Sequence, residues 1–282
     1  METLGLHIEK ADNDSFERIK AFVEQYEFFC VQLCSQLKNG LTDFYIIYNS
    51  NSQIWGVLYL HRIMNYCLPF VDVNSTDEYI QNDIYKLILK NKITCISGEK
   101  KGSDFILNIL EKTKTYPSQK NIYKLMILSS EPKIPPQKLQ MDEEIKRCSL
   151  EDFDLLFDIQ KKYLIKEVMP LNKEISDLEI SVGLKQILKK QITFALLVDY
   201  EAVSKVNTNA IGFNWVQLGG VYTHPLYRRN YYAWHLINYL SHRVLKSGKN
   251  ICLFVKEKNI PAIALYQNIG FIEKGAYQIL YF

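Results

Sequence analysis

A proline-rich stretch divides the chain of 282 residues near its middle. Residues 129–136 read SSEPKIPP. Proline removes a backbone donor and fixes φ, so this stretch can be neither a helix nor a central strand. Each flanking half is long enough to bury a core of its own. The sequence therefore predicts one domain at residues 1–128, a linker at 129–142 and a second domain at 143–282.

Hydrophobic periodicity in the first half predicts alternating helices and strands. Apolar residues three to four positions apart predict helices at 14–38, 75–90 and 103–112. Short apolar or alternating runs predict strands at 44–48, 54–60, 67–73, 93–97 and 122–128. This order of elements is that of a complete small α/β unit.

The second half repeats a similar order of elements. Strands are expected at 145–148, 192–198, 202–206, 215–223, 251–255 and 276–282. Helices are expected at 150–163, 173–189, 232–245 and 261–268. The fold class predicted for the chain is α/β, with mixed α+β sheets in both halves.

Composition and charge exclude several classes of function. The net charge is +3 and the basic runs are short, so no nucleic-acid partner is expected. No apolar run approaches the roughly 20 residues of a membrane span, so no membrane association is expected. The six cysteines do not show the spacing of a zinc site, so no metal is expected. Free cysteines and a start without signal-peptide features favour the cytoplasm.

One segment of the second half has the chemistry of an anion site. Residues 219–233 read GGVYTHPLYRRNYYA, which predicts a strand, a basic turn and the start of a helix. Unpaired N–H groups at a helix N-terminus suit a pyrophosphate, and Arg228 and Arg229 add two positive charges. A solvated basic turn is the alternative interpretation.

A second segment follows about twenty residues later. Residues 253–271 read LFVKEKNIPAIALYQNIGF. The spacing from Asn259 to Tyr266 and then to Gly270 and Phe271 resembles the closing signature of the GNAT superfamily of N-acetyltransferases. The Val-x-Thr-x-Pro-x-x-Arg pattern in 221–228 resembles the pyrophosphate loop of that superfamily.

The resemblance covers residues 143–282 well and residues 1–128 only by element order. It implies a branch of the superfamily with two GNAT-like domains in tandem, of which the N-terminal one is degenerate. It also implies an acetyl-CoA-dependent N-acetyltransferase, in which an amine acceptor attacks the thioester directly. Neither the identity of the amine nor an oligomeric state is predicted by any pattern in the sequence.

The resemblance also assigns roles to individual residues. The residues implied to bind the cofactor are Val221, Tyr222, Thr223, Arg228, Arg229, Asn230, Tyr231, Tyr232, Ala233 and Asn259. Tyr266 is implied to protonate the departing thiolate, which a phenol with a pKa of about 10 can do at neutral pH. Glu167 is the candidate base for the amine, with His224 as an alternative. Tyr266 can also be interpreted as a core aromatic residue.

The loop departs from the family pattern at one position. Tyr231 stands where the family has glycine, which lets the backbone approach a phosphate. An ordinary helical φ at Tyr231 would let the side chain point outward and preserve binding. A positive φ would strain the side chain and impair the site. A non-catalytic CoA-binding or regulatory module is therefore the alternative function.

The first half contains a weaker phosphate-loop pattern. Residues 98–103 read GEKKGS between a predicted strand and a predicted helix, without the ending of a P-loop. A turn in which Ser103 caps the helix is the expected structure. The N-terminal half is then non-catalytic and helps to shape the acceptor site.

Overall fold

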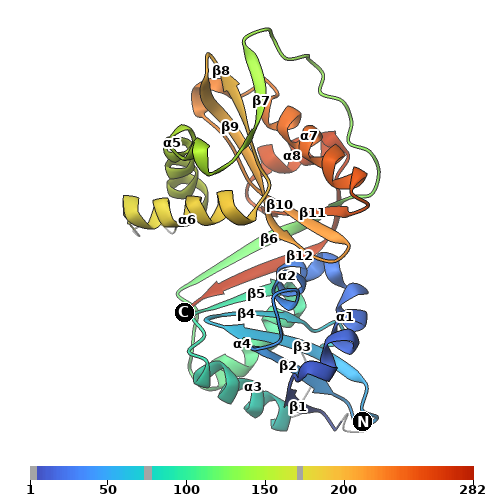
Figure 1. Ribbon diagram of the computed structural model, residues 1–282. Helices are drawn as coiled ribbons and strands as arrows, with labels where there is room; N and C mark the ends of the chain where they lie inside the picture. Colours follow the sequence, from blue (N-terminus) through green and yellow to red (C-terminus); the bar gives the residue numbers. More distant parts are fainter. Residues whose placement is uncertain (1–4, 73–77, 170–173) are drawn as a thin grey trace.

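The computed structural model describes residues 5–72, 78–169 and 174–282. Its strands form one 12-stranded sheet, with the order β1-β2-β3-β4-β5-β12-β6-β11-β10-β9-β8-β7 (Figure 1). The strands are β1 (His7–Lys10), β2 (Phe44–Tyr48), β3 (Ile54–His61), β4 (Ile63–Cys67), β5 (Cys95–Glu99), β6 (Gln119–Leu128), β7 (Glu143–Cys148), β8 (Thr193–Val198), β9 (Glu201–Ile211), β10 (Trp215–Thr223), β11 (Asn250–Lys256) and β12 (Ile272–Tyr281). The main helices are α1 (Phe16–Glu24), α2 (Val31–Leu37), α3 (Glu78–Lys90), α4 (Lys100–Lys112), α5 (Phe153–Tyr163), α6 (Asp177–Lys190), α7 (Tyr232–Lys246) and α8 (Ile260–Ile269).

The two halves of the chain have the same topology. In each half, strands pair antiparallel until a helix crosses over to a parallel neighbour: α3 joins β4 to β5, and α7 joins β10 to β11. A further helix, α4 or α8, follows each of these parallel strands. This repeat confirms the expected mixed α/β fold in tandem.

The two halves also exchange their last strands. β6 belongs to the first half of the sequence, yet it pairs antiparallel with β11 of the second half. β12 ends the second half and pairs antiparallel with β5 of the first half. β6 and β12 pair with each other, so the sheet continues from one half into the other. The predicted boundaries at residues 128 and 143 stay a prediction.

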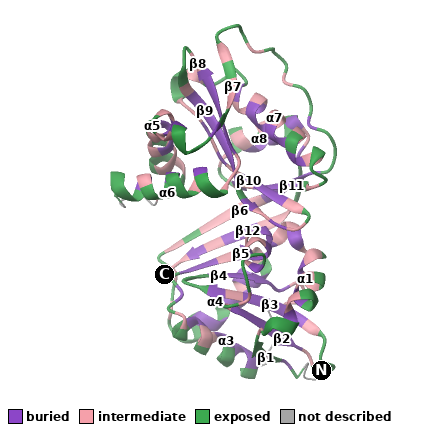
Figure 2. Ribbon diagram, viewed as in Figure 1, coloured by how far each residue is buried: buried purple, intermediate pink, exposed green. Residues whose placement is uncertain are grey.

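Helices cover both faces of the sheet in each half. In the second half α5 and α6 cover one face, and α7 and α8 cover the other (Figure 1). Figure 2 shows that the strands between these layers are largely buried. Part of the α5 face of β9, β10 and β11 is instead covered by the N-terminal segment that leads into α2. The first half thus contributes to the surroundings of β10.

Several sequence predictions differ from the structure in detail. The strand expected at 67–73 lies earlier in the chain, because β4 spans Ile63–Cys67 and residues 68–72 are not in a strand. The helix expected at 14–38 is interrupted by a short 3-10 turn, η2 (Glu27–Phe29), because the carboxylate of Glu27 accepts hydrogen bonds from the backbone of Asn214 and Trp215. The helix α4 begins at Lys100 rather than at Ser103. The predicted start of α3 at residue 75 lies outside the described residues.

The proline-rich stretch packs against the second half. The indole Nε1 of Trp234 on α7 donates a 2.8 Å hydrogen bond to the carbonyl oxygen of Lys133. The backbone N–H of Lys133 in turn donates to the carbonyl oxygen of Ile269 at the end of α8. The stretch is therefore held along α7 and α8.

In the part of the chain that the structure describes, no helix combines the length and the hydropathy needed to cross a membrane. No group of three or more His, Cys, Asp or Glu side chains among the described residues could hold a metal ion. All six cysteines are free and buried.

Candidate active site

A gap opens in the sheet where β10 and β11 part. The two strands pair in parallel from Trp215 to Leu218, and within the described residues the ladder ends there although both strands continue. On the other side of β10, pairing with β9 passes from Gly219 directly to Tyr222. The residues between them, Gly220 and Val221, belong to neither of these ladders.

Gly220 forms a bulge at this gap. Its φ is +59°, a left-handed conformation that favours glycine. A Cβ atom at this position would lie 1.8 Å from Oδ1 of Asn207 and 3.0 Å from Nζ of Lys205. The structure therefore requires glycine at position 220, because no side chain fits beside these two polar groups.

Lys205 and Tyr163 hold the backbone of the bulge. Nζ of Lys205 donates a 2.9 Å hydrogen bond to the carbonyl oxygen of Gly220, and the Lys205 residue is only 2% exposed. Burial raises the pKa of Tyr163 to about 12, although a hydrogen bond from the backbone of Gly220 acts in the opposite direction. Both residues lie on the face covered by α5.

Aromatic side chains lie on both faces of the sheet near the gap. Tyr163 and Tyr222 pack edge to face, with ring centroids 6.2 Å apart, on the α5 side. Tyr266 comes from α8 on the opposite side, where its ring packs edge to face against Phe271. Burial raises the pKa of Tyr266, and the neighbouring Tyr163 adds to the increase. A neutral phenol that resists ionisation is the protonated form that a proton donor needs.

Glu167 lies at the same gap as Tyr266. It belongs to one π-helical turn, η4 (Leu164–Val168), a rare geometry that occurs often at functional sites. Lys256 at the end of β11 ties this turn to the sheet, because its Nζ donates a 2.6 Å hydrogen bond to the carbonyl oxygen of Glu167. The Glu167 carboxylate is close enough to raise the pKa of Tyr266 further. The two residues predicted to be catalytic thus lie within electrostatic range of each other.

The basic turn after β10 leads into α7 through two left-handed residues. Arg229 has a φ of +70° and Tyr231 a φ of +60°. Tyr231 therefore has the positive φ that the sequence analysis connected with strain, at a cost of roughly 1–2 kcal/mol. Its side chain is 41% exposed and packs edge to face against Trp234, with ring centroids 6.2 Å apart. The turn thus keeps a glycine-like backbone with a tyrosine in it.

Arg228 is exposed, but it turns back toward β10. Its Nε donates a 3.2 Å hydrogen bond to the carbonyl oxygen of Thr223, and its guanidinium lies 5.9 Å from the centre of the Tyr222 ring. Thr223 pairs with Ser204 in the β9 ladder. Of the predicted cofactor strand, Val221 is the residue whose backbone both ladders leave unpaired.

The remaining predicted cofactor residues are distributed around the starts of α7 and α8. The side chain of Asn230 donates to the carbonyl oxygen of Tyr227. Tyr232 is buried and its hydroxyl donates to the carboxylate of Glu143, whereas Ala233 is half-buried in the first turn of α7. Asn259 caps α8, where its Oδ1 accepts a 3.3 Å hydrogen bond from the N–H of Ala262.

His224 directly follows β10 and is the alternative base. Burial lowers its pKa, and the nearby cations Lys162, Lys166 and Arg228 lower it further. Its Nδ1 is buried and has no hydrogen-bond partner among the described residues. The ring is therefore neutral near pH 7 and has one nitrogen without a protein partner.

The sequence analysis did not find Tyr163, Lys205 or the bulge as parts of this site. The Gly219–Gly220 pair inside a predicted strand was the available signal, because glycine within a strand marks a bulge or a close backbone approach. Lys205 carried no such signal, because nothing in a strand pattern distinguishes a buried lysine from an exposed one.

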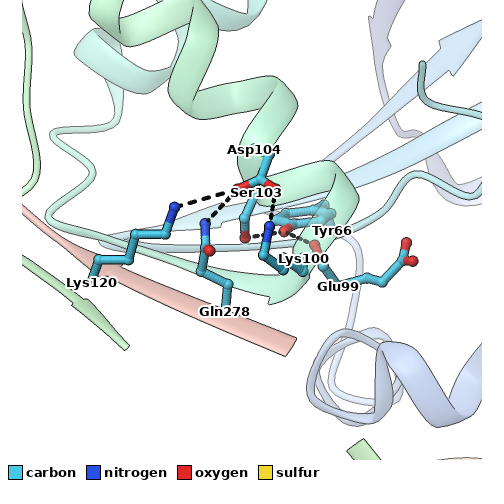
Figure 3. Close-up of polar contacts among 7 residues, drawn as sticks. All are labelled: Tyr66, Glu99, Lys100, Ser103, Asp104, Lys120 and Gln278. Carbon is cyan, nitrogen blue, oxygen red and sulfur yellow. Dashed lines mark hydrogen bonds and ion pairs between the residues drawn. The ribbon is translucent and has the colours of Figure 1, made fainter. Parts of the chain in front are cut away.

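In the first half, the position that corresponds to the gap lies beyond the parallel pairing of β4 and β5, and side chains fill it. The ring of Tyr66 on β4 lies so close to Gly98 and Gly102 that a Cβ on either would come within 2.4 Å of it. The Tyr66 hydroxyl hydrogen-bonds with Ser103 and donates to the carbonyl oxygen of Glu99 (Figure 3). Ser103 thus lies within α4 as a partner of Tyr66, not as a helix cap.

Charged side chains form ion pairs at the start of α4, beside Tyr66. Asp104 forms ion pairs with Lys100 and Lys120, and its Oδ1 accepts a 3.2 Å hydrogen bond from Gln278 of β12 (Figure 3). The side chains at the start of α4 therefore satisfy one another. The phosphate-loop pattern at 98–103 serves the packing of β4, α4 and β12.

Comparisons with known proteins agree with this architecture. Residues 187–279 match the model of the family described as FR47-like protein. A Drosophila protein of known structure aligns at 13% identity over 99% of both chains, with a TM-score of 0.67. A GCN5-related N-acetyltransferase from Sphaerobacter thermophilus aligns at 11% identity over 98% of this chain and 94% of its own, with a TM-score of 0.61.

A tandem GNAT protein from the clavulanic acid biosynthesis pathway aligns at 11% identity over 98% of this chain and 97% of its own, with a TM-score of 0.56. No curated protein matches the chain. At these identities the solved structures show the fold, and the family model adds the relationship of residues 187–279. The chain therefore has the GNAT fold in tandem and carries an FR47-like, GNAT-related segment at residues 187–279.

Proposed function

We propose that the protein is an acetyl-CoA-dependent N-acetyltransferase that transfers the acetyl group to an amine by direct attack on the thioester. The observation that carries this proposal is the convergence of Tyr266 and Glu167, from opposite faces of the sheet, on the gap between β10 and β11. A gap in a sheet accepts an extended ligand as an added strand. The protein groups for both proton transfers are then next to the reacting atoms.

The proposed cofactor site combines the gap with the turn at 228–233. Val221 supplies backbone groups for the pantetheine arm, with Tyr222 and Thr223 continuing the strand. The amides from Arg228 to the start of α7 face the pyrophosphate at the positive end of a helix of 15 residues. Asn259 orders the start of α8 beside the arm. The description of the tandem GNAT protein of similar fold names AcCoA, in a form that lacks it, and we propose acetyl-CoA as the donor here.

Two residues move the protons. Glu167 takes one proton from the acceptor ammonium, so that a neutral amine attacks the thioester carbonyl. The new C–N bond forms as the C–S bond breaks. The second proton of the nitrogen is lost as Tyr266 protonates the departing sulfur, and the phenol is then restored. The products are the amide, free CoA and the proton released from Glu167.

The first half supports this site without a second cofactor. Its equivalent region is filled by Tyr66 and the ion pairs of Asp104. We place its function in shaping the acceptor side, because the segment around η2 covers part of β10 and β11. The proposed compartment is the cytoplasm, in which the six free cysteines stay reduced.

A non-catalytic CoA-binding or regulatory module is the second candidate. The positive φ of Tyr231 favours it, because a bulky residue occupies the position at which glycine lets the backbone approach a phosphate. Such a module would bind CoA without releasing product, or would have lost the cofactor altogether.

The test is the thermal stability of the purified protein with saturating acetyl-CoA, followed by CoA release with a panel of amines. A ligand at 100 times its dissociation constant adds about 2.7 kcal/mol of stability, which raises the melting temperature by several degrees. A rise together with CoA release supports the transferase. A rise without release for any amine supports the CoA-binding module. A folded protein with no rise contradicts the transferase and leaves only a module that has lost the cofactor.

A further inference from the structure

Lys205 is a buried amine at the centre of the candidate site. Its Nζ donates to two neutral oxygens, the carbonyl oxygen of Gly220 at 2.9 Å and Oδ1 of Asn207 at 3.3 Å. The ring of Tyr163 covers it, with 4.6 Å between Nζ and the ring centre. Burying an amine among neutral groups is costly, so such a residue indicates a functional role.

The hydrogen bond to Gly220 fixes the orientation of one peptide group. The Gly220–Val221 peptide is trans, so the carbonyl of Gly220 and the N–H of Val221 point in opposite directions. Nζ of Lys205 lies beneath the ring of Tyr163, on the face covered by α5, and the carbonyl oxygen of Gly220 faces this Nζ. The N–H of Val221 therefore points away from Lys205, at a residue that belongs to neither the β9 nor the β11 ladder.

We propose that Lys205 is a positioning residue that turns and polarises the Gly220–Val221 peptide, so that the N–H of Val221 receives the carbonyl oxygen of the acyl thioester. This inference rests on the proposed function. When the carbonyl oxygen accepts a hydrogen bond from a positively charged group, the N–H at the other end of the same peptide becomes a stronger hydrogen-bond donor. Donors aimed at the developing oxyanion stabilise the transition state of acyl transfer.

The proposal also connects the site to pH. Burial lowers the pKa of Lys205 to about 7, and the Cys148 thiol on β7 acts in the opposite direction. The other titratable groups that face it are Tyr163 from α5 and Tyr222 from β10, with Glu167 of η4 next to both tyrosines. Raising the pH through this range removes the charge that polarises the peptide.

The experiment uses acetyl-CoA labelled with ¹³C at the acetyl carbonyl, bound to the full-length protein. Polarisation of the carbonyl moves its NMR signal downfield, and this readout needs no acceptor. We compare the wild type with Lys205→Met, which removes the charge, and with Lys205→Arg, which keeps it. Lys189→Met on the exposed end of α6 is the matched control. Calorimetry measures acetyl-CoA binding, and circular dichroism measures folding.

We expect the downfield shift in the wild type, in Lys205→Arg and in Lys189→Met, and its loss in Lys205→Met with acetyl-CoA still bound. Turnover with an accepted amine should fall by about tenfold or more in Lys205→Met. In the wild type the shift should decline between about pH 6 and pH 8, whereas in Lys205→Arg it should stay constant.

An unchanged shift in Lys205→Met with bound acetyl-CoA would overturn the inference and leave the proposed function intact. If Lys205→Met does not fold, the wild type and Lys205→Arg decide, and a carbonyl signal that does not move downfield when acetyl-CoA binds to either protein overturns the inference. Absence of acetyl-CoA binding by the wild type would overturn the proposed function itself, and the inference with it.

Discussion

The carboxylate of Glu27 accepts a 3.2 Å hydrogen bond from the backbone N–H of Trp215, the first residue of β10. Glu27 lies in the N-terminal half of the sequence and is completely buried. It also accepts from the N–H of Asn214, and a Cβ on Gly212 would collide with its Oε1. One side chain of the first half therefore fixes the turn that starts the proposed cofactor strand.

Replacing this carboxylate should destabilise the protein. Glu27→Gln places an amide nitrogen opposite one of the backbone N–H groups, and an unsatisfied buried group costs about 1–3 kcal/mol. Burial raises the pKa of Glu27, although the backbone hydrogen bonds oppose this. The folded state therefore keeps a proton that the unfolded state loses, and the wild type loses stability as the pH rises from the usual glutamate range through the raised pKa.

The free-energy difference between wild type and Glu27→Gln should consequently be largest under acidic conditions and shrink toward neutral pH. Urea unfolding at several pH values measures it. Glu201→Gln, at an exposed position at the start of β9, provides the control. A difference that grows with pH would contradict the raised pKa.

Removing the hydroxyl of Tyr266 should slow the reaction without weakening cofactor binding. Tyr266→Phe keeps the ring that packs against Phe271, while the proton donor is lost. Loss of a general acid lowers turnover by about 10²-fold or more. CoA release measures turnover, and calorimetry measures acetyl-CoA affinity. Tyr200→Phe, at an exposed turn, should change neither, and equal turnover in Tyr266→Phe would remove the proposed role.

Local sequence patterns predicted most of the helices and strands but not which strands pair with each other. The strand expected at 251–255 and the helix expected at 261–268 both follow from short-range patterns and correspond to β11 and α8. The exchange of β6 and β12 does not, because strand pairing across the halves depends on packing between residues more than 100 positions apart. The interruption of the first helix was missed for the same reason, since the partners of Glu27 are Asn214 and Trp215, at the start of β10.

The residues of the candidate site also differ in whether the sequence could predict them. The motif residues Tyr266 and Arg228 could be found because their spacing along the chain carries the pattern. Lys205 could not, because its neighbours come from three separate elements. The φ of Tyr231 was open as well, because sequence alone permits both a helical and a left-handed tyrosine.

A side chain at the bulge should disturb the whole site. Gly220→Ala introduces a Cβ within 1.8 Å of Oδ1 of Asn207 at a φ of +59°. Strain at a left-handed residue alone costs roughly 1–2 kcal/mol, and the collision adds to it. Urea unfolding should therefore show a loss of about 2 kcal/mol or more. Gly183→Ala in α6 is the matched control, because nothing lies within 4 Å of its Cβ and alanine favours the helix.

The strain at Tyr231 can be measured by comparing two substitutions. Tyr231→Ala and Tyr231→Gly both remove the contact with Trp234, but only glycine relieves a φ of +60°. The glycine variant should be more stable than the alanine variant by about 1 kcal/mol. Thermal or urea unfolding checks this order. If Tyr231→Ala is more stable than Tyr231→Gly, residue 231 does not have a left-handed backbone conformation in the folded protein. Acetyl-CoA affinity of the glycine variant then shows whether the tyrosine side chain hinders binding.

The lowered pKa of Lys205 should make the free energy of unfolding depend on pH. Burial lowers its pKa to about 7 in the folded state, so between that pH and its usual value near 10.5 the unfolded state binds more protons than the folded state. Stability contributed by this group therefore rises with pH in that window, by about 2 kcal/mol between pH 7.5 and pH 9. Cysteines and tyrosines titrate nearby, so the informative quantity is the difference between wild type and Lys205→Met. That difference should shift in favour of the wild type as the pH rises, and a difference that stays constant would show that Lys205 is charged in the folded protein throughout this range.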